Sequence, residues 1–210
     1  MFSKIFEYFT HHDRDMRDNR WIFASMFVGA VLSLIAAFVL SIDAVELARN
    51  PNVSLSCNIN AIISCGTVAK TSFASMFGFP NSFLGLISEP VVITVAIAGL
   101  AGVKFPRWFM FTAQIFYSLG FIFALSLFAI GLLFVHAVCP WCMLVTMSTT
   151  FVWFSVARYN IRENNLFLSK KLSKKAKLFI SKDYDRFALA TVVLAILAIL
   201  ILNYGSSLFA

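Results

Sequence analysis

The chain has 210 residues, of which 60% are hydrophobic and 13% are charged, and its formal net charge is +7. Several uncharged stretches exceed the roughly 20 residues that a helix needs to span a bilayer, which excludes an ordinary soluble globular protein. The positive charge requires no nucleic acid, because most basic residues flank the apolar stretches, as in membrane proteins. We therefore predict an integral membrane protein whose partners include the lipid bilayer and no nucleic acid.

Five apolar segments are long enough for transmembrane helices. The uncharged run from Trp108 to Ala157 has 50 residues and would measure about 75 Å as one helix, at about 1.5 Å per residue. It is too long for one crossing, so we divide it into two. The second segment contains Glu89 and a proline, which a helix inside a bundle can tolerate. The predicted spans are residues 21–42, 81–103, 108–137, 139–157 and 187–204.

The basic residues predict the orientation, because Lys and Arg near span ends stay preferentially in the cytoplasm. A cytoplasmic N-terminus leaves only Arg49 and Lys70 outside. The loop 43–80 is then extracytoplasmic, and the lysine-rich segment 158–186 is a cytoplasmic connector with an attraction to anionic lipid heads. We predict a single membrane domain, residues 1–210, built as a helical bundle.

All four cysteines are extracytoplasmic in this topology. Cys57 and Cys65 fall in the outer loop, and Cys139 and Cys142 form a Cys-Pro-Trp-Cys motif at the start of the fourth span. An even number of cysteines in an oxidising compartment predicts disulfide pairing. A bridge within Cys-x-x-Cys closes too few residues to stabilise a fold by much, so the motif favours redox exchange.

The Cys-x-x-Cys segment also favours a reactive thiolate. Pro140 suits the first position of a helix, which places Cys139 at the N-cap and Cys142 in the first turn. Unpaired backbone N–H groups and the positive end of the helix dipole lower the pKa of a thiol there, whereas burial among apolar side chains raises it. Cys142 lies 16 residues before Arg158, or roughly 24 Å of helix, so a lipid-soluble partner can reach it near the outer edge of the hydrocarbon.

Two other interpretations of the cysteines stay open from the residues alone. Static disulfides could stabilise a membrane protein without turnover, such as a binding or assembly factor. A four-cysteine zinc site is the second interpretation. The 7 residues between Cys57 and Cys65 exceed the usual spacing of about two to four, so we expect no metal.

The order of the motifs is distinctive. The outer loop carries CNIN at 57–60 and SCG at 64–66, FGFPNSFLG at 77–85 enters the second span, and CPWC at 139–142 opens the fourth. This order resembles that of bacterial homologues of vitamin K epoxide reductase, over about residues 20–160. The resemblance implies an all-α membrane fold: a four-helix bundle around a quinone site, a fifth transmembrane helix, and an extracytoplasmic loop that acts as a lid.

The resemblance also implies a role for each cysteine. Cys57 would be attacked by the thiolate of a reduced partner protein. Cys65 would then attack Cys139, so that an interloop disulfide carries the oxidising equivalent. Cys142 would face the quinone and pass two electrons to it, and Asn81 resembles the family's amide that hydrogen-bonds a quinone carbonyl.

Several polar residues near these motifs have open roles. Thr71 stands where relatives often have a serine, and the adjacent Ser72 offers a second hydroxyl; both are candidate quinone contacts. Thr146 is a further candidate, at a position where the vertebrate enzymes have a tyrosine, which weakens the case for an epoxide substrate. His136 and Glu89 are ionisable: for His136 a proton-relay role competes with a structural one, and for Glu89 a functional role inside the span competes with helix packing.

The resemblance therefore implies a thiol-to-quinone oxidoreductase in a bacterial plasma membrane that supports disulfide formation outside the cytoplasm. The electron acceptor would be menaquinone or ubiquinone. The thiol partner would be a separate thioredoxin-like (DsbA-like) oxidase, because this sequence ends at Ala210 where some relatives continue into a thioredoxin-like domain. The alternatives are reduction of a quinone or its epoxide for quinone recycling, and a non-catalytic protein stapled by disulfides.

Overall fold

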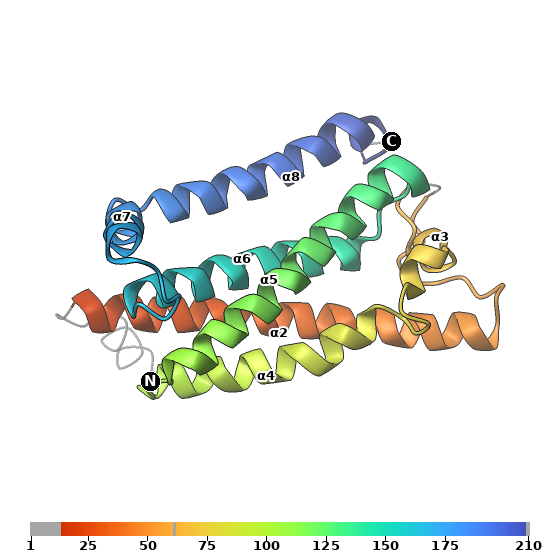
Figure 1. Cartoon of the computed structure of the whole chain (residues 1–210). Helices are drawn as coiled ribbons and strands as arrows, with labels where there is room; N and C mark the ends of the chain where they lie inside the picture. Colours follow the sequence, from red (N-terminus) through yellow and green to blue (C-terminus); the bar gives the residue numbers. More distant parts are fainter. Residues whose placement is uncertain (1–13, 61, 209–210) are drawn as a thin grey trace, which may run out of the picture.

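The computed structural model describes residues 14–60 and 62–208, and this part of the chain is helical and has no strand (Figure 1). Residues 1–13, 61 and 209–210, which belong to the predicted domain 1–210, lie outside the described residues. The predicted all-α membrane fold is confirmed.

Five of the described helices are long and apolar enough to cross a membrane. They are α2 (Arg14–Arg49), α4 (Ser82–Leu100), α5 (Arg107–Ile130), α6 (Pro140–Arg162) and α8 (Tyr184–Leu208). Shorter elements connect them: α3 (Cys65–Ala69) and the 3-10 helix η1 (Ser72–Ser75) follow α2, the π-helical turn η2 (Gly131–Val135) continues α5, and α7 (Lys170–Ser181) precedes α8.

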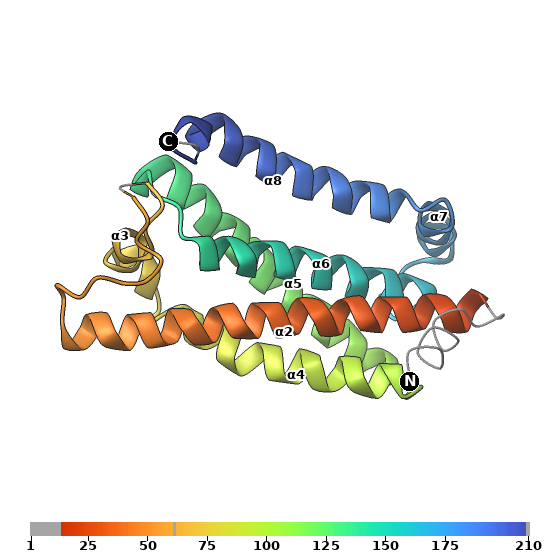
Figure 2. The same ribbon diagram turned by 180° about the vertical axis from the view of Figure 1, so that it is seen from behind.

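The bundle is organised around α2, which packs against both α4 and α6, while α5 packs against α6 (Figures 1 and 2). Close approach depends on small residues. A Cβ added to Gly99 of α4 would overlap the Phe23 ring, and one added to Gly29 would lie 2.7 Å from Val152 Cγ2. A side chain at either glycine would force the facing side chain, or the helix that carries it, to shift, because protein interiors leave little free space.

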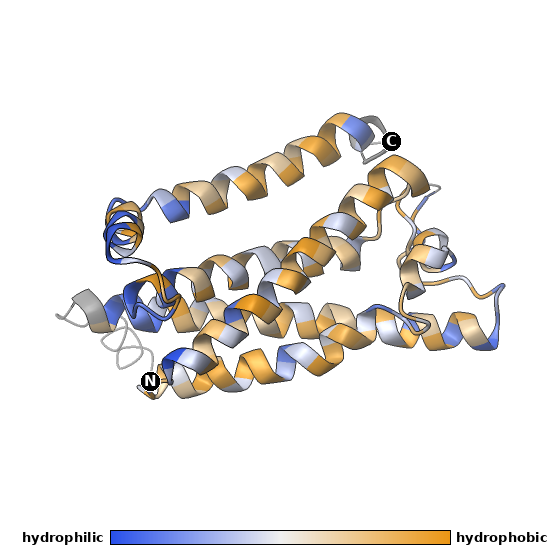
Figure 3. Cartoon of the chain, viewed as in Figure 1, coloured by the Kyte–Doolittle hydropathy of each residue, from blue (hydrophilic) through white to orange (hydrophobic). Residues whose placement is uncertain are grey.

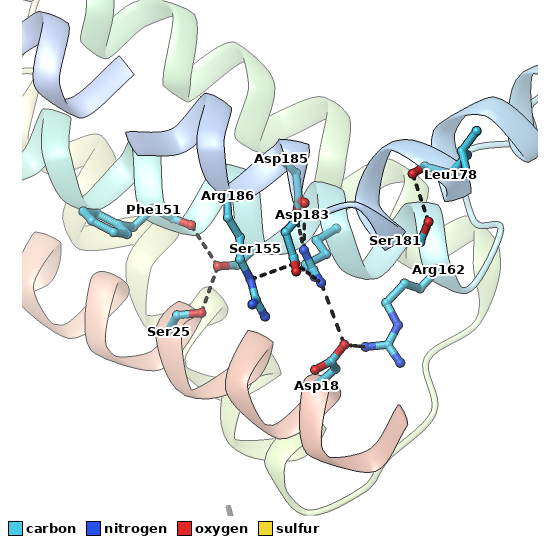
Figure 4. A network of polar contacts seen from close by, with 11 residues as sticks. Asp18, Ser25, Phe151, Ser155, Arg162, Leu178, Ser181, Asp183, Asp185 and Arg186 are labelled. Carbon is cyan, nitrogen blue, oxygen red and sulfur yellow. Dashed lines mark hydrogen bonds and ion pairs between the residues drawn. The ribbon is translucent and has the colours of Figure 1, made fainter. Parts of the chain in front are cut away.

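The fifth span, α8, lies outside the other four and contacts α6 (Figures 1 and 2). An ionic network holds its N-terminal end (Figure 4). Arg158 of α6 donates to both carboxylate oxygens of Asp185 at 2.7 Å and to Asp183 at 3.1 Å. Asp18 of α2 lies 3.8 Å from Arg158 and 3.5 Å from Arg162. This network joins the ends of three helices, and Asp185 also complements the positive end of the α8 dipole.

Glu89 lies buried inside the bundle rather than facing lipid. Ser33 of α2 donates to its Oε1 at 3.0 Å, and Tyr117 of α5 donates to the two carboxylate oxygens at 3.4 and 3.5 Å. A polar side chain buried in the hydrocarbon region needs such partners. Glu89 therefore links three spans, which favours a packing role for it.

Hydropathy separates the two ends of the molecule from its middle (Figure 3). Apolar residues run along the spans, and hydrophilic residues gather at α7 and on the turns. Figures 1 and 2 show α7 end-on while the spans run lengthwise, so α7 crosses the direction of the bundle. The outer loop with α3 lies at the opposite end, which places the cysteine-bearing loop far from the lysine-rich helix.

Candidate redox site at the cysteine cluster

The four cysteines gather at the α3 end of the bundle. Cys57, Cys65 and Cys139 are buried together with Leu55, and Cys142 is half-buried against them. The apolar side chains that pack around this cluster are Leu40, Leu47, Val53, Val68 and Trp141. The sequence placed the two cysteine pairs on one side of the membrane, and the structure brings them into one cluster.

A short main-chain pairing joins the outer loop to the segment before α6. Ser64 N donates to Val138 O at 3.1 Å, and Val138 N donates to Ile62 O at 2.7 Å. These two hydrogen bonds form an isolated parallel bridge between Ile63 and Val138. The bridge lies directly beside Cys65 and Cys139 in the sequence, so it sets the distance between the two pairs.

Asn58 fixes the turn between the loop cysteines. Its Oδ1 accepts from Ser64 Oγ at 3.0 Å and from Gly66 N at 2.9 Å. A Cβ at Gly66 would lie 2.9 Å from Asn58 Nδ2, so the glycine permits this approach. Ser64 also caps α3 by accepting from Thr67 N at 3.1 Å. No role for Asn58 was predicted from the sequence, although its position beside Cys57 and the Ser-Cys-Gly motif that follows were available signals.

The cysteines occupy two different redox states. Cys57 and Cys65 form a disulfide, while Cys139 and Cys142 are free thiols. The Cys139 sulfur lies 3.3 Å from the Cys65 sulfur. Thiol–disulfide exchange proceeds by attack of a thiolate on one sulfur of a disulfide. The cluster therefore places a free thiol from one chain segment beside a disulfide from another.

Cys139 caps helix α6, as the Cys-Pro-Trp-Cys motif predicted. Pro140 occupies the first turn, and the Cys139 sulfur accepts from Cys142 N at 3.4 Å. The pKa of the Cys139 thiol is lowered, chiefly because the Cys142 thiol hydrogen-bonds to it and also because the N–H groups of Cys142 and Trp141 do so; burial opposes the shift. The Cys139 thiol is therefore ionised to a greater extent at neutral pH than an ordinary cysteine thiol.

Asp43 is an unpredicted member of the cluster. Helix α2 continues past residue 42, the predicted end of the first span, and ends at Arg49. This extension carries the Asp43 carboxylate to 3.6 Å from the Cys57 sulfur, and the side chain is buried. The ligand atoms of Asp43, Cys57 and Cys65 lie within 4.8 Å of one another, but the disulfide occupies both sulfurs.

The predicted quinone contacts are not all beside Cys142. Thr146 is buried one turn below it and donates to the Cys142 carbonyl at 3.0 Å. Asn81 instead closes the loop before α4: its amide donates to Phe73 O at 2.7 Å, and its Oδ1 accepts from Met76 N at 3.2 Å. The hydroxyl groups of Thr71 and Ser72 also have different surroundings. Thr71 donates to the Val68 carbonyl at 2.7 Å, and Ser72 is exposed at the start of η1.

Aromatic contacts attach the predicted lid to the outer end of the third span. The ring centroid of Phe73 lies 6.2 Å from that of Phe134, and Phe77 lies 5.5 Å from Phe123. Phe77 is 57% exposed, so this surface is apolar and faces outward. His136 is exposed and ends η2 with a φ of 53°, which favours its role as a turn residue.

The cysteine surroundings fit a quinone in chemical terms. A half-buried thiol, apolar neighbours and a few hydroxyl and amide groups are what a flat, lipid-soluble acceptor needs. A comparison with curated protein sequences gave no match. The model of the vitamin K epoxide reductase family matches residues 24–157, well over half of the chain, and this region contains all four cysteines. The chain therefore belongs to the vitamin K epoxide reductase family, and with its membrane-spanning helices it is a membrane oxidoreductase.

Proposed function

We propose that this protein reoxidises a separate, extracytoplasmic thioredoxin-like thiol oxidase and passes two electrons to a membrane quinone, with the four cysteines as the relay. The single observation that carries the proposal is the 3.3 Å separation of the Cys139 and Cys65 sulfurs. The free thiols of Cys139 and Cys142 also favour exchange over static stapling.

The relay begins at the loop disulfide. A thiolate of the partner attacks Cys57, and its second thiol completes the reduction of the Cys57–Cys65 bond. Cys57 is only 7% exposed, whereas Ser56 and Asn58 on either side are exposed. The partner therefore needs a small movement of this loop to reach the sulfur.

The second exchange moves two electrons inward and returns the disulfide to the outer loop. When Cys139 and Cys142 are joined, the Cys65 thiolate attacks Cys139, the Cys139–Cys142 bond breaks, and Cys142 leaves as a thiolate. Attack by Cys57 on Cys65 then releases Cys139. This sequence ends with a Cys57–Cys65 disulfide and two free thiols on α6, which is the arrangement of the four cysteines described above.

The final step returns Cys139 and Cys142 to a disulfide. A bound quinone, menaquinone or ubiquinone, supplies a two-electron acceptor there. Cys142 holds the donating sulfur at the start of a span, where the acceptor arrives from the lipid. Thr146 borders this position, and Asn81, Thr71 and Ser72 are the other proposed contacts. Asn81 reaches a quinone carbonyl only if it releases the Phe73 carbonyl that it now contacts.

The proposed orientation follows from the basic residues, with the lysine-rich connector inside and the cysteines outside. The family resemblance supports the proposed location, a multi-pass protein of a bacterial plasma membrane. Topology is testable with a membrane-impermeant thiol reagent on reduced, intact cells. Labelling of Cys57 supports the assignment, and protection of all four cysteines until the cells are opened contradicts it.

The function is tested by anaerobic mixing of the purified protein with a reduced thioredoxin-like partner and a soluble quinone analogue. The quinone absorbance should fall with the native cysteines and stay constant with Cys139→Ser or Cys142→Ser. Turnover in either variant would contradict the relay. A Met143→Leu protein is the control, because it changes the same helical turn without removing a thiol.

A further inference from the structure

We propose that Asp43 is the proton acceptor and donor of the Cys57 thiol, and thus a catalytic residue of the loop exchange. This inference rests on the proposed function, because it assigns a role in a step in which Cys57 reacts.

The contact joins a rigid group to a reactive one. The Asp43 Oδ2 lies 3.6 Å from the Cys57 sulfur. Both residues are 7% exposed, so bulk water has little access to either side chain. Asp43 belongs to the long helix α2, whereas Cys57 belongs to a loop that is tied down by Asn58. The carboxylate therefore keeps its place while the sulfur changes bonding partner.

Among the described residues, no ion pair joins a Lys, Arg or His side chain to the Asp43 carboxylate. Its charged or titratable neighbours are Glu46 on the next turn of α2 and the thiol pair at the start of α6. A buried carboxylate surrounded in this way is ready to accept a proton from a thiol in contact with it.

The proton is needed in one defined step. Starting from the Cys65–Cys139 disulfide, the Cys57 thiol gives its proton to the Asp43 carboxylate as its sulfur attacks Cys65. The Cys57–Cys65 bond forms, the Cys65–Cys139 bond breaks, and its electron pair leaves with Cys139 as a thiolate. No external oxidant takes part. When the partner later reduces the loop disulfide, Cys57 leaves as a thiolate and recovers the proton from Asp43.

The two sulfurs that exchange with Cys65, those of Cys57 and Cys139, are thus activated in different ways. Cys139 is a good leaving group because the Cys142 thiol and, to a smaller extent, the N–H groups at the cap of α6 stabilise its thiolate. Cys57 has no helix N-terminus of its own, and an unperturbed thiol, with a pKa of about 8.5, is mostly protonated at neutral pH. A general base in contact with Cys57 promotes formation of its thiolate, as the N-terminus of α6 does for Cys139.

The test uses a Cys142→Ala protein, which needs neither quinone nor partner. Its one disulfide is distributed between Cys57–Cys65, which leaves Cys139 free, and Cys65–Cys139, which leaves Cys57 free. A jump in pH shifts that distribution if the free thiol ionises differently in the two forms. Acid quenching, alkylation and peptide mass spectrometry then give the relaxation rate. The substitutions compared in this background are Asp43→Asn, Asp43→Glu and, as the matched control one turn away, Glu46→Gln.

The Asp43→Asn protein should relax about 100-fold more slowly near pH 6.5, as expected for loss of a general base. The difference in relaxation rate between this variant and the parent should shrink as pH rises, because hydroxide then removes the thiol proton in place of the carboxylate. Asp43→Glu should keep the shallow pH dependence of the parent, and Glu46→Gln should match the parent rate.

An equal loss at every pH would assign Asp43 a purely structural role and overturn the proposal, and so would an unchanged rate. If Asp43→Asn does not fold, Asp43→Glu decides alone: a steep, hydroxide-like pH dependence would overturn the proposal. Absence of any Cys65–Cys139 disulfide in the parent would instead contradict the relay, so the two failures are distinguishable.

Discussion

The sulfurs of Cys65 and Cys139 lie 3.3 Å apart although 74 positions separate the residues in the chain. The bridge between Ile63 and Val138 holds the two segments next to each other, and the N-cap position of Cys139 aims its thiol at the loop. The loop disulfide and the helix-anchored thiols therefore form one cluster of sulfurs.

The thiol of Cys139 should ionise below the usual pH range of cysteine. Its pKa is lowered by the Cys142 thiol and by two backbone N–H groups. A lowered pKa means that the thiolate persists as pH falls, so alkylation of Cys139 should show a midpoint below about 8.5. Cys142→Ala should raise the midpoint, whereas Cys142→Ser, which keeps a donor, should raise it less. Mass spectrometry of the Cys139 peptide gives the rates, and equal midpoints in all three proteins would contradict the assignment.

Asn58 should be needed for the register of the outer loop. Asn58→Ala removes the acceptor of Ser64 Oγ and Gly66 N, at a cost of about 1 kcal/mol for each hydrogen bond. We expect faster hydrogen exchange at Gly66 and slower exchange between the cysteine pairs. Asn52→Ala, in an exposed turn of the same loop, is the control and should leave both quantities unchanged. If the rates of hydrogen exchange at Gly66 and of thiol–disulfide exchange are identical in the two variants, Asn58 does not position the loop.

Arg158 should hold α8 to the bundle. Its side chain is 10% exposed and that of Asp185 is 11% exposed, so Arg158→Gln leaves a carboxylate unpaired in a buried place, at a cost of about 3 kcal/mol. Arg186 pairs with Asp183 in solvent, with side-chain exposures of 57% and 54%. Arg186→Gln should therefore cost less than about 1 kcal/mol. Thermal unfolding in detergent compares them, and equal melting temperatures would contradict the anchoring role.

Helix α7 should lie on an anionic membrane surface. Lys170, Lys174 and Lys177 share one helical face, whereas Leu172 and Phe179 lie on the opposite, apolar face. Each lysine near such a surface contributes about 1 kcal/mol. In nanodiscs, hydrogen exchange of α7 should slow when anionic lipid is added, and replacement of the three lysines by glutamine should remove the difference. Replacement by arginine should preserve it; slowing that persists in the glutamine variant would contradict the electrostatic account.

The sequence was sufficient where the signal is local. Long apolar runs predict the spans because a bilayer admits only helices of that length, and Pro140 predicts the cap at Cys139 because its ring suits the first turn. The family resemblance drawn from the cysteine motifs is confirmed by the match over residues 24–157.

The tertiary contacts could not be predicted in the same way. Asp43 was assigned to the loop because hydropathy ends a span at its first charge, whereas packing against the cysteine cluster continues the helix to Arg49. The contact of Asn81 with Phe73 O depends on how the loop folds back, which no short pattern encodes. The role of Asn81 at a quinone stays a prediction.

The most direct test of the relay is to trap its interloop disulfide. In a protein carrying Cys57→Ala and Cys142→Ala, only Cys65 and Cys139 remain, and mild oxidation in the membrane should join them within one chain. Peptide mass spectrometry before and after reduction identifies the bridge. The account predicts nearly complete formation of Cys65–Cys139. Two freely alkylated thiols under the same oxidation, in a protein that is still folded, would contradict it.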